Sequence, residues 1–286
     1  MLNKDSLDFI AGKLFNEEES EKTNRNAGMI MKKIVFFDID GTLLDHDKKL
    51  PDSTKRAVKQ LQENGVYVAI ATGRAPFMFA DLRKELGIDS FVSFNGQYVV
   101  FENELIYHNP LDKKALQGVY EQAKENGTPL IYMNDTTLKG TVEYSKHVEV
   151  TLATFTLSHP EYDEYFFKEN DVYQTLLYCT ETEEQDYIGR HNDVRFIRWH
   201  PVCMDVVPAG GSKALGIQRF IERAGFDLGD VYAFGDGLND IEMLEAVGTG
   251  IAMGNAEKEL LPHADIVTTA VDDDGIYNGL VKVGLL

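Results

Sequence analysis

The chain has 286 residues, of which 43% are hydrophobic and 10% aromatic, so it is long and apolar enough to fold as one large globular domain or two smaller ones. Its formal net charge of −19 disfavours attraction of nucleic acids or anionic membranes by the general field of the protein, so local groups would have to hold an anionic substrate. No apolar run reaches the length of a membrane-spanning helix and the N-terminus lacks the apolar core of a secretory signal, which leads us to expect a cytoplasmic protein.

Residues 1–30 differ in composition from the rest of the chain. Asp5 and Ser6 could cap a short amphipathic helix, but residues 16–28 are polar and charged. We interpret residues 1–30 as an N-terminal extension or tag and expect the folded domain to begin near Met31.

Strand and helix patterns alternate after Lys33. The apolar run Ile34-Val35-Phe36-Phe37 has the length and composition of a buried strand, and it stops at acidic residues. The next predicted elements are a helix over 53–64, a strand over 66–71, a helix over 76–86, a strand over 91–95 and a hairpin over 98–101 and 105–107. Alternation of this kind predicts right-handed crossovers and a parallel sheet.

The alternation of predicted strands and helices is interrupted between Leu111 and Met204. This segment has its own predicted helices, over 113–126 and 183–191, and its own strands, over 130–133, 174–178 and 194–199. We therefore interpret residues 111–204 as a separate, inserted α+β domain.

The strand-helix alternation returns after this segment. The predicted elements are a helix over 213–224, a strand over 231–234, a helix over 239–247 and a strand over 250–252. The sequence thus predicts an α/β fold with a Rossmann-like, doubly wound parallel-sheet core, made of residues 31–110 and 205–286, around the inserted domain. Ligands of such sheets bind outside the carboxyl ends of the strands.

Two carboxylates directly follow the first predicted strand. In the segment DIDGT, Asp38 and Asp40 are two positions apart, so continued strand geometry would direct both to one side. Two ionised carboxylates about 4 Å apart repel by roughly 4 kcal/mol at an effective dielectric near 20. A divalent cation would keep one ionised as a nucleophile, while the other could carry a proton for a leaving group. A plain acidic strand end, with Asp40-Gly41 as turn residues, is an alternative that this segment alone leaves open.

A second acidic cluster follows a later predicted strand and opens a helix. It contains Asp236, Asn239 and Asp240, and a helix cap with a turn would account for it in isolation. Both clusters would meet at one sheet edge, which predicts a site of oxygen ligands suited to Mg²⁺. The sequence has no HxH or HExxH pattern that would favour zinc.

Groups that could hold a phosphate lie at two further places. Thr72 and Gly73, after the second strand, offer a hydroxyl and a backbone amide. Lys213 lies at a predicted helix start, where the helix dipole disfavours a cation, and this hints at a ligand-facing role. A glycine turn at a strand exit and a solvated lysine are the respective alternatives.

Taken together, these segments resemble the haloacid dehalogenase superfamily and, within it, the Cof-type sugar-phosphate phosphatases. Its four motifs are matched in order by DIDGTL at 38–43, TGR at 72–74, Lys213 and GDGLNDIEML at 235–244. The likeness extends over residues 31–286 and includes Asn95-Gly96 and the segment MGNA at 253–256. The insertion between the second and third motifs is similar to that of members with a mobile α/β cap, which implies a small-molecule substrate.

The resemblance also implies a role for each matching residue. Asp38 would be the nucleophile, and Asp40 the general acid and then the general base. Magnesium would be held by Asp38, the carbonyl of Asp40 and Asp236, with Asp240 supporting the site. The phosphoryl group would be held by the Ile39 amide, Thr72, Gly73, Lys213 and Asn239.

The sequence therefore predicts a magnesium-dependent phosphatase that hydrolyses small-molecule phosphate monoesters, in particular sugar phosphates or related metabolites, through an aspartyl-phosphate. The alternatives are a phosphomutase acting on a sugar phosphate and a catalytically silent binding protein on the same fold. The expected partner is a small phosphorylated metabolite, not a nucleic acid or a membrane. No oligomeric state is predicted, and we interpret Tyr132, Tyr144, His147 and Trp199 of the inserted domain as core or surface residues.

Overall fold

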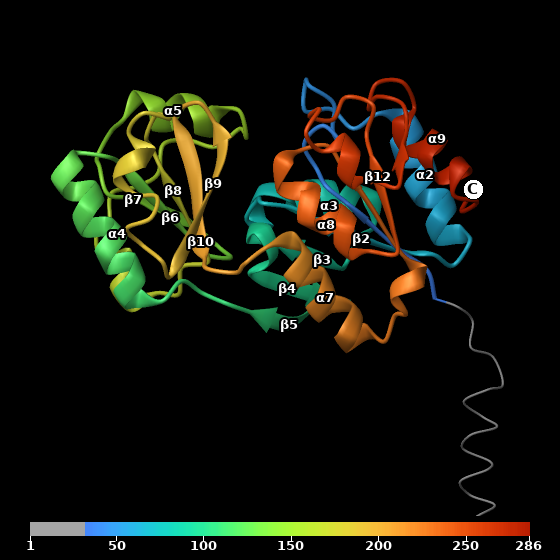
Figure 1. The fold of residues 1–286 in the computed structure, drawn as a ribbon, viewed down its shortest axis with the longest axis horizontal. Helices are drawn as coiled ribbons and strands as arrows, with labels where there is room; N and C mark the ends of the chain where they lie inside the picture. Colours follow the sequence, from blue (N-terminus) through green and yellow to red (C-terminus); the bar gives the residue numbers. More distant parts are fainter. Residues whose placement is uncertain (1–31) are drawn as a thin grey trace, which may run out of the picture. The chain divides into compact units, whose positions relative to one another are not determined.

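The computed structural model of the chain describes residues 32–286 (Figure 1), and the predicted N-terminal extension over residues 1–30 lies outside them. The described residues fold around two β-sheets, one of eight strands and one of five. The α/β class predicted from the sequence agrees with this architecture.

The eight-stranded sheet carries the predicted strand-helix alternation. Its order is β13-β12-β11-β1-β2-β3-β4-β5, and the neighbours from β13 to β3 are parallel. The predicted hairpin supplies β4 and β5, which pair in antiparallel fashion at one edge, so the sheet is mixed. The strands are β1 (Ile34–Phe37), β2 (Tyr67–Ala71), β3 (Phe91–Ser93), β4 (Tyr98–Phe101), β5 (Glu104–His108), β11 (Val231–Gly235), β12 (Thr249–Ala252) and β13 (Ile266–Val267).

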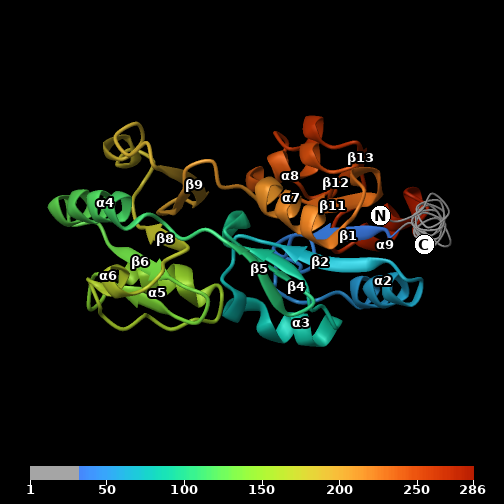
Figure 2. The ribbon, with the colours of Figure 1, turned by 90° about the horizontal axis from the view of Figure 1, so that it is seen from below.

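Helices cover both faces of this sheet (Figure 2). Val35 and Phe37 of β1 join a hydrophobic core with α2, α3 and α9, whereas Ile34 and Phe36 join a second core with α7 and α8. The helices are α2 (Asp52–Glu63), α3 (Ala80–Leu86), α7 (Lys213–Ala224), α8 (Ile241–Ala246) and α9 (Gly275–Lys282). Because both faces are covered, β1 reads as a continuous apolar run without alternation.

The five-stranded sheet is antiparallel and has the order β7-β6-β8-β10-β9. Figure 1 shows the chain entering this part after β5 and leaving it after β10. Its elements are α4 (Lys113–Asn126), β6 (Leu130–Met133), β7 (Leu138–Gly140), α5 (Lys146–Ala153), α6 (Phe166–Glu169), β8 (Gln174–Leu177), β9 (Val194–His200) and β10 (Cys203–Pro208). Since Val206 and Val207 still pair with β9, the sheet continues beyond Met204, where we expected the inserted domain to end.

One predicted element is wrong. The helix expected over 183–191 is only a 3₁₀ turn, Glu184–Asp186, none of whose residues is buried. Nearby, Tyr187 is fully buried while Gly189 takes a φ of +83°. A single buried side chain gives the segment no apolar helical face, and a left-handed glycine ends the turn.

A close approach between two glycines sets the position of α7. A Cβ on Gly216 would lie 2.5 Å from Val92 Cγ1 and 2.7 Å from the Cα of Gly96. Gly96 itself has a φ of +99°, and a Cβ there would lie 2.0 Å from the Ser212 carbonyl oxygen. The missing side chains let the first turns of α7, which begins at Lys213, lie directly against the loop after β3.

This packing predicts that Gly216→Ala destabilises the protein although alanine is the better helix former. Overpacking should lower the free energy of unfolding by about 1–3 kcal/mol. Gly118→Ala in α4 is the matched control, because its Cβ would lie 3.5 Å from the nearest atom, His191 Nδ1, in ordinary contact. That change should be neutral or stabilise by up to about 1 kcal/mol. Urea unfolding measures the free energy of unfolding of both variants. Equal values for the two would contradict the prediction.

Candidate active site

The three central strands of the large sheet end at one edge. β1 lies between β2 and β11 and is parallel to both, with Phe37 paired to Ile70 and to Phe234. The residues that follow these strands, Asp38, Thr72 and Asp236, are therefore neighbours in space, as their sequence positions predict.

Lys213 is buried between two of the predicted site residues. Its side chain is fully enclosed, and Nζ donates hydrogen bonds of 2.6 Å to Asp38 Oδ1 and of 2.6 Å to Asp240 Oδ1. Burial alone would lower the pKa of Lys213, but the charges of Asp240 and Asp38 outweigh burial and raise the pKa. The lysine is thus a permanent cation inside the protein, and a solvated lysine is excluded.

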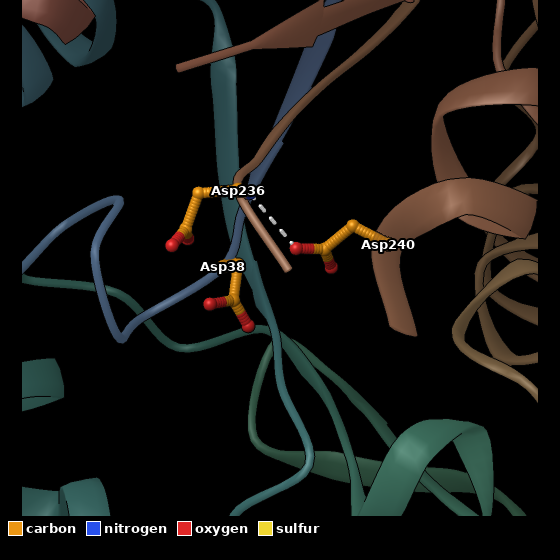
Figure 3. Close-up of side chains that lie close together, drawn as sticks. All are labelled: Asp38, Asp236 and Asp240. Atoms are coloured by element: carbon orange, nitrogen blue, oxygen red, sulfur yellow. Dashed lines mark hydrogen bonds between the residues drawn. The ribbon is translucent and has the colours of Figure 1, made fainter. Parts of the chain in front are cut away.

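Asp240 holds the backbone that carries Asp236. Its Oδ2 accepts hydrogen bonds of 3.0 Å from the backbone N–H groups of Asp236 and Gly237, and Figure 3 shows the first of these. A Cβ on Gly235 would lie 2.6 Å from Asp240 Cγ, so only glycine leaves room for this carboxylate. Because its other oxygen accepts a hydrogen bond from Lys213, Asp240 anchors the loop of Asp236 and Gly237 to the start of α7.

Asp38, Asp236 and Asp240 form the acidic group expected from the sequence. They can each present an oxygen within 4.8 Å of the others, and Figure 3 shows the Asp38 and Asp236 carboxylates side by side. Asp236 also accepts a hydrogen bond of 2.8 Å from the Thr42 hydroxyl.

The charges in this group fit a divalent cation. Burial raises the pKa of Asp38 to about 7 despite Lys213, with Asp240 and Asp40 adding to the rise. Burial and the charges of Asp38 and Asp240 raise the pKa of Asp236 to about 8. The surroundings of these two carboxylates therefore contain too little positive charge to keep both ionised. A divalent ion at their oxygens would restore the ionised form.

The Asp40 carboxylate is not one of the three that form this acidic group, and it pairs with two cations instead. The sequence placed only the backbone carbonyl of Asp40 in the metal site, and that placement stays a prediction. Arg74 Nε and Nη2 donate to the two carboxylate oxygens of Asp40 at 2.8 and 2.5 Å, and Lys48 Nζ donates to Oδ1 at 2.5 Å. Burial alone would raise the pKa of Asp40, but the hydrogen bonds and charges of Arg74 and Lys48 outweigh burial and lower the pKa. The sequence did not predict these two cationic partners.

The residues expected to hold a phosphate surround the same place. Thr72 is buried and its Oγ1 accepts the backbone N–H of Arg74 at 3.1 Å. Gly73 and Asn239 line the same pocket as Asp38. The side chain of Ile39 is fully buried, so only its backbone could contact a phosphate.

Asn95 connects these loops with the inserted domain. Its Nδ2 donates to Gln174 Oε1 at 3.0 Å and to Asp205 Oδ2 at 2.9 Å, and its Oδ1 accepts from Asn239 at 3.2 Å. The backbone takes a left-handed φ of +52°, from which its N–H donates to the Thr72 carbonyl at 3.1 Å. The sequence used Asn95 only as part of a motif. Two features of the sequence could have indicated this contact. Asparagine tolerates the left-handed conformation and Asn95 lies where a strand ends, and Asp205 is an acidic residue in an otherwise apolar strand.

A pocket of about 430 Å³ lies between this edge of the large sheet and the inserted domain. Asp38, Asp40 and Asn239 line one side, and residues of the inserted domain, among them Phe155 and Trp199, line the other. Trp199 is 36% exposed, so it is a surface residue as expected, and its surface is part of this pocket.

In residues 32–286, no helix combines the length and the apolar character that crossing a membrane requires. Cytoplasmic location and a small phosphorylated partner stay predictions, as do the catalytic, phosphate-binding and metal-binding roles of the individual residues.

Comparison with known proteins shows relatives over most of the chain. A family model described as haloacid dehalogenase-like hydrolase matches residues 35–280. YkrA of Bacillus subtilis (strain 168), named as a candidate phosphatase, is 48% identical over 89% of this chain and 98% of its own length. A hypothetical protein from Geobacillus kaustophilus HTA426 has 54% identity and a TM-score of 0.84, over 89% of this chain and 100% of that chain. The HAD subclass IIB sugar phosphatase BT4131 has 29% identity and a TM-score of 0.81, over 89% of this chain and 100% of that chain.

The buried ion pair predicts a large effect of Asp240→Asn on stability. Removing one of the two anions beside an enclosed cation should lower the free energy of unfolding by about 3–5 kcal/mol. Glu85→Gln is the control, because Glu85 pairs with Lys55 at 2.8 Å with both side chains about half exposed. Loss of such a surface pair should change stability by less than about 1 kcal/mol. Urea unfolding measures this free energy. Similar losses for both variants would contradict the prediction that the buried pair of Asp240 and Lys213 stabilises the fold.

Proposed function

The chain belongs to the haloacid dehalogenase-like hydrolases and is an enzyme of the phosphatase class, and we propose that it hydrolyses small-molecule phosphate monoesters in a Mg²⁺-dependent reaction through an aspartyl-phosphate on Asp38. The observation that carries the proposal is the buried Lys213, held between Asp38 and Asp240 beside the Asp236 carboxylate. An ammonium group and a nucleophilic carboxylate at one pocket edge suit an anionic phosphoryl group.

The first step forms a bond between an Asp38 carboxylate oxygen and phosphorus. The bond from phosphorus to the ester oxygen breaks, and Asp40 gives its proton to that oxygen, so an alcohol leaves. Lys213, whose Nζ lies 2.6 Å from Asp38 Oδ1, offsets the charge that gathers on the transferring group. Thr72, the backbone of Ile39 and Gly73, and Asn239 would orient the phosphoryl oxygens.

The second step returns the enzyme to its starting state. Asp40 accepts a proton from water as the water oxygen attacks phosphorus, and the bond between phosphorus and Asp38 breaks to release inorganic phosphate. The pairing of Asp40 with Arg74 and Lys48 keeps Asp40 ionised, which is the form that this base step requires. For the acid step Asp40 must be protonated, and a bound phosphate competing for Arg74 and Lys48 would raise the pKa of Asp40.

Asp38, Asp236 and the backbone carbonyl of Asp40 would hold the Mg²⁺ ion, with Asp240 as the anchor of the Asp236 loop. When bound, the ion supplies positive charge that lets the phosphate approach the carboxylates. The structural fit is the set of carboxylate oxygens within 4.8 Å, which lacks enough positive charge without an ion.

We also propose that the inserted domain, residues 111–204 with the continuation to Pro208, acts as a cap. It supplies the opposite wall of the pocket, where contacts with the part of a substrate beyond the phosphate would be made. Similarity to the sugar phosphatase BT4131 supports sugar phosphates or related small metabolites as the substrate class.

The proposal predicts that Asp38→Asn lowers Mg²⁺-dependent release of phosphate from p-nitrophenyl phosphate by about 10³-fold or more. Asp47→Asn, at an exposed position on the loop after β1, should keep the wild-type rate. A rapid burst of p-nitrophenol equal to the enzyme concentration would support the covalent step. A folded Asp38→Asn variant with wild-type turnover would rule that step out.

The same assay separates the alternatives. Transfer of the phosphoryl group to a sugar without phosphate release would identify a phosphomutase. Binding of phosphate esters without turnover of any of them would identify a silent binding protein.

Metal binding should depend on Asp236 but not on Lys213. Asp236→Ala should weaken Mg²⁺ affinity by more than about tenfold, because it removes a ligand oxygen. Lys213→Ala removes a nearby positive charge, so it should leave Mg²⁺ affinity unchanged or higher while it impairs turnover. Isothermal titration calorimetry measures the affinity independently of activity. Wild-type affinity in the Asp236 variant would remove Asp236 from the ligand set.

A further inference from the structure

The wall that the inserted domain contributes to the pocket is largely apolar. Its lining includes Met133 of β6, Leu152 of α5 and Leu176 of β8, all buried in the inserted domain. Phe155 and Trp199 add two aromatic rings to this wall. A ligand whose phosphate lies near Asp38 would therefore have hydrocarbon and aromatic surface around the rest of the molecule.

The two aromatic rings of this wall contact each other. Their centroids are 5.6 Å apart and their planes are inclined by 59°. The Arg74 guanidinium carbon lies 4.9 Å from the centroid of Phe155. Asp205, on the same wall, accepts a hydrogen bond of 2.9 Å from Asn95, which connects this wall to the loops around Asp38. An indole offers a large, flat apolar surface and has few rotatable bonds, so a ligand orders it at low entropic cost.

Most polar groups of the same wall are already used inside the protein. Gln174 accepts from Asn95 and donates to a backbone carbonyl at 3.1 Å. The Thr154 hydroxyl donates to a backbone carbonyl at 2.6 Å, and His200 Nδ1 accepts a backbone N–H at 3.3 Å. The groups left to meet a ligand on this wall are one oxygen of Asp205, the other nitrogen of His200, the second N–H of Gln174 and the acceptor side of the Thr154 hydroxyl.

The apolar and aromatic lining favours one of two kinds of leaving group. A sugar brings several hydroxyls, and each one buried without a partner is unfavourable. A flat ring buries its faces against apolar surface and needs polar partners only at its edge. We propose that the pocket selects phosphate esters of planar aromatic or heteroaromatic alcohols, with the ring against Phe155 and Trp199, over those of polyhydroxylated sugars.

This inference rests on the proposed phosphatase function and narrows its substrate. It departs from the sugar phosphates that the sequence resemblance implies, because the pocket wall of this chain is the part that meets the leaving group.

Two esters of primary alcohols test the preference with leaving groups of similar reactivity. With Mg²⁺ present, kcat/KM for benzyl phosphate should exceed that for glucose 6-phosphate by about tenfold or more. An equal or higher value for glucose 6-phosphate would overturn the proposal. If p-nitrophenyl phosphate is not hydrolysed either, the proposed phosphatase function is what fails.

Variants of Trp199 test whether the ring of the leaving group lies against this side chain. Trp199→Ala should lower kcat/KM for benzyl phosphate about tenfold more than for glucose 6-phosphate, mainly through KM. Trp199→Phe keeps an aromatic face and should recover most of this loss. Tyr144→Ala is the matched control, because Tyr144 is an aromatic residue of the same domain that is 62% exposed and outside the pocket. Equal losses with both substrates would overturn the assignment of Trp199.

Fluorescence gives a readout that does not depend on turnover. Trp199 is the single tryptophan of the chain, so its emission reports on this wall alone. Benzylphosphonate, which cannot be hydrolysed at its P–C bond, should change the emission in a saturable way and at lower concentration than ethylphosphonate, which lacks the ring. Emission that benzylphosphonate leaves unchanged would overturn the proposal even if the protein is an active phosphatase.

Discussion

The site depends on the enclosure of one cation, Lys213, between Asp38 and Asp240. A lysine at the first position of a helix opposes the helix dipole, and its burial is tolerable only because two carboxylates contact its ammonium group. The glycine contact between Gly96 and Gly216 brings the helix close enough for this to happen. One buried charge therefore holds together the end of β1, the start of α7 and the loop after β11.

Asp240 links this charge to the rest of the acidic group. While one oxygen contacts Lys213, the other orders the backbone of Asp236 and Gly237. The carboxylates of Asp38 and Asp236 are then left side by side with less positive charge than they need. The contacts of Asp240 thus both order the loop of Asp236 and place two carboxylates where they could bind a divalent cation.

The pocket joins two chemically different halves. In a chain with a formal net charge of −19, Lys48 and Arg74 line the half where a phosphate would bind and Lys213 contacts Asp38 of that half, whereas the opposite half is largely apolar. Asn95 bonds to both halves through Asn239 and Asp205, so a shift of the inserted domain would be felt in the loops around Asp38.

Local pattern determined much of this protein: the strand Ile34–Phe37, the helices Lys113–Asn126 and Lys213–Ala224, and the meeting of Asp38, Thr72 and Asp236 at one edge. Strand ends in a parallel sheet meet whatever the side-chain packing, so residue order suffices to place them. Only the tertiary structure decided that Arg74 and Lys48 pair with Asp40, that Asn95 bonds to Asp205, and that Trp199 lines the pocket. It also replaced the helix expected over 183–191 by a short turn. These features arise from contacts between segments far apart in the chain, whose distances and burial no local pattern encodes.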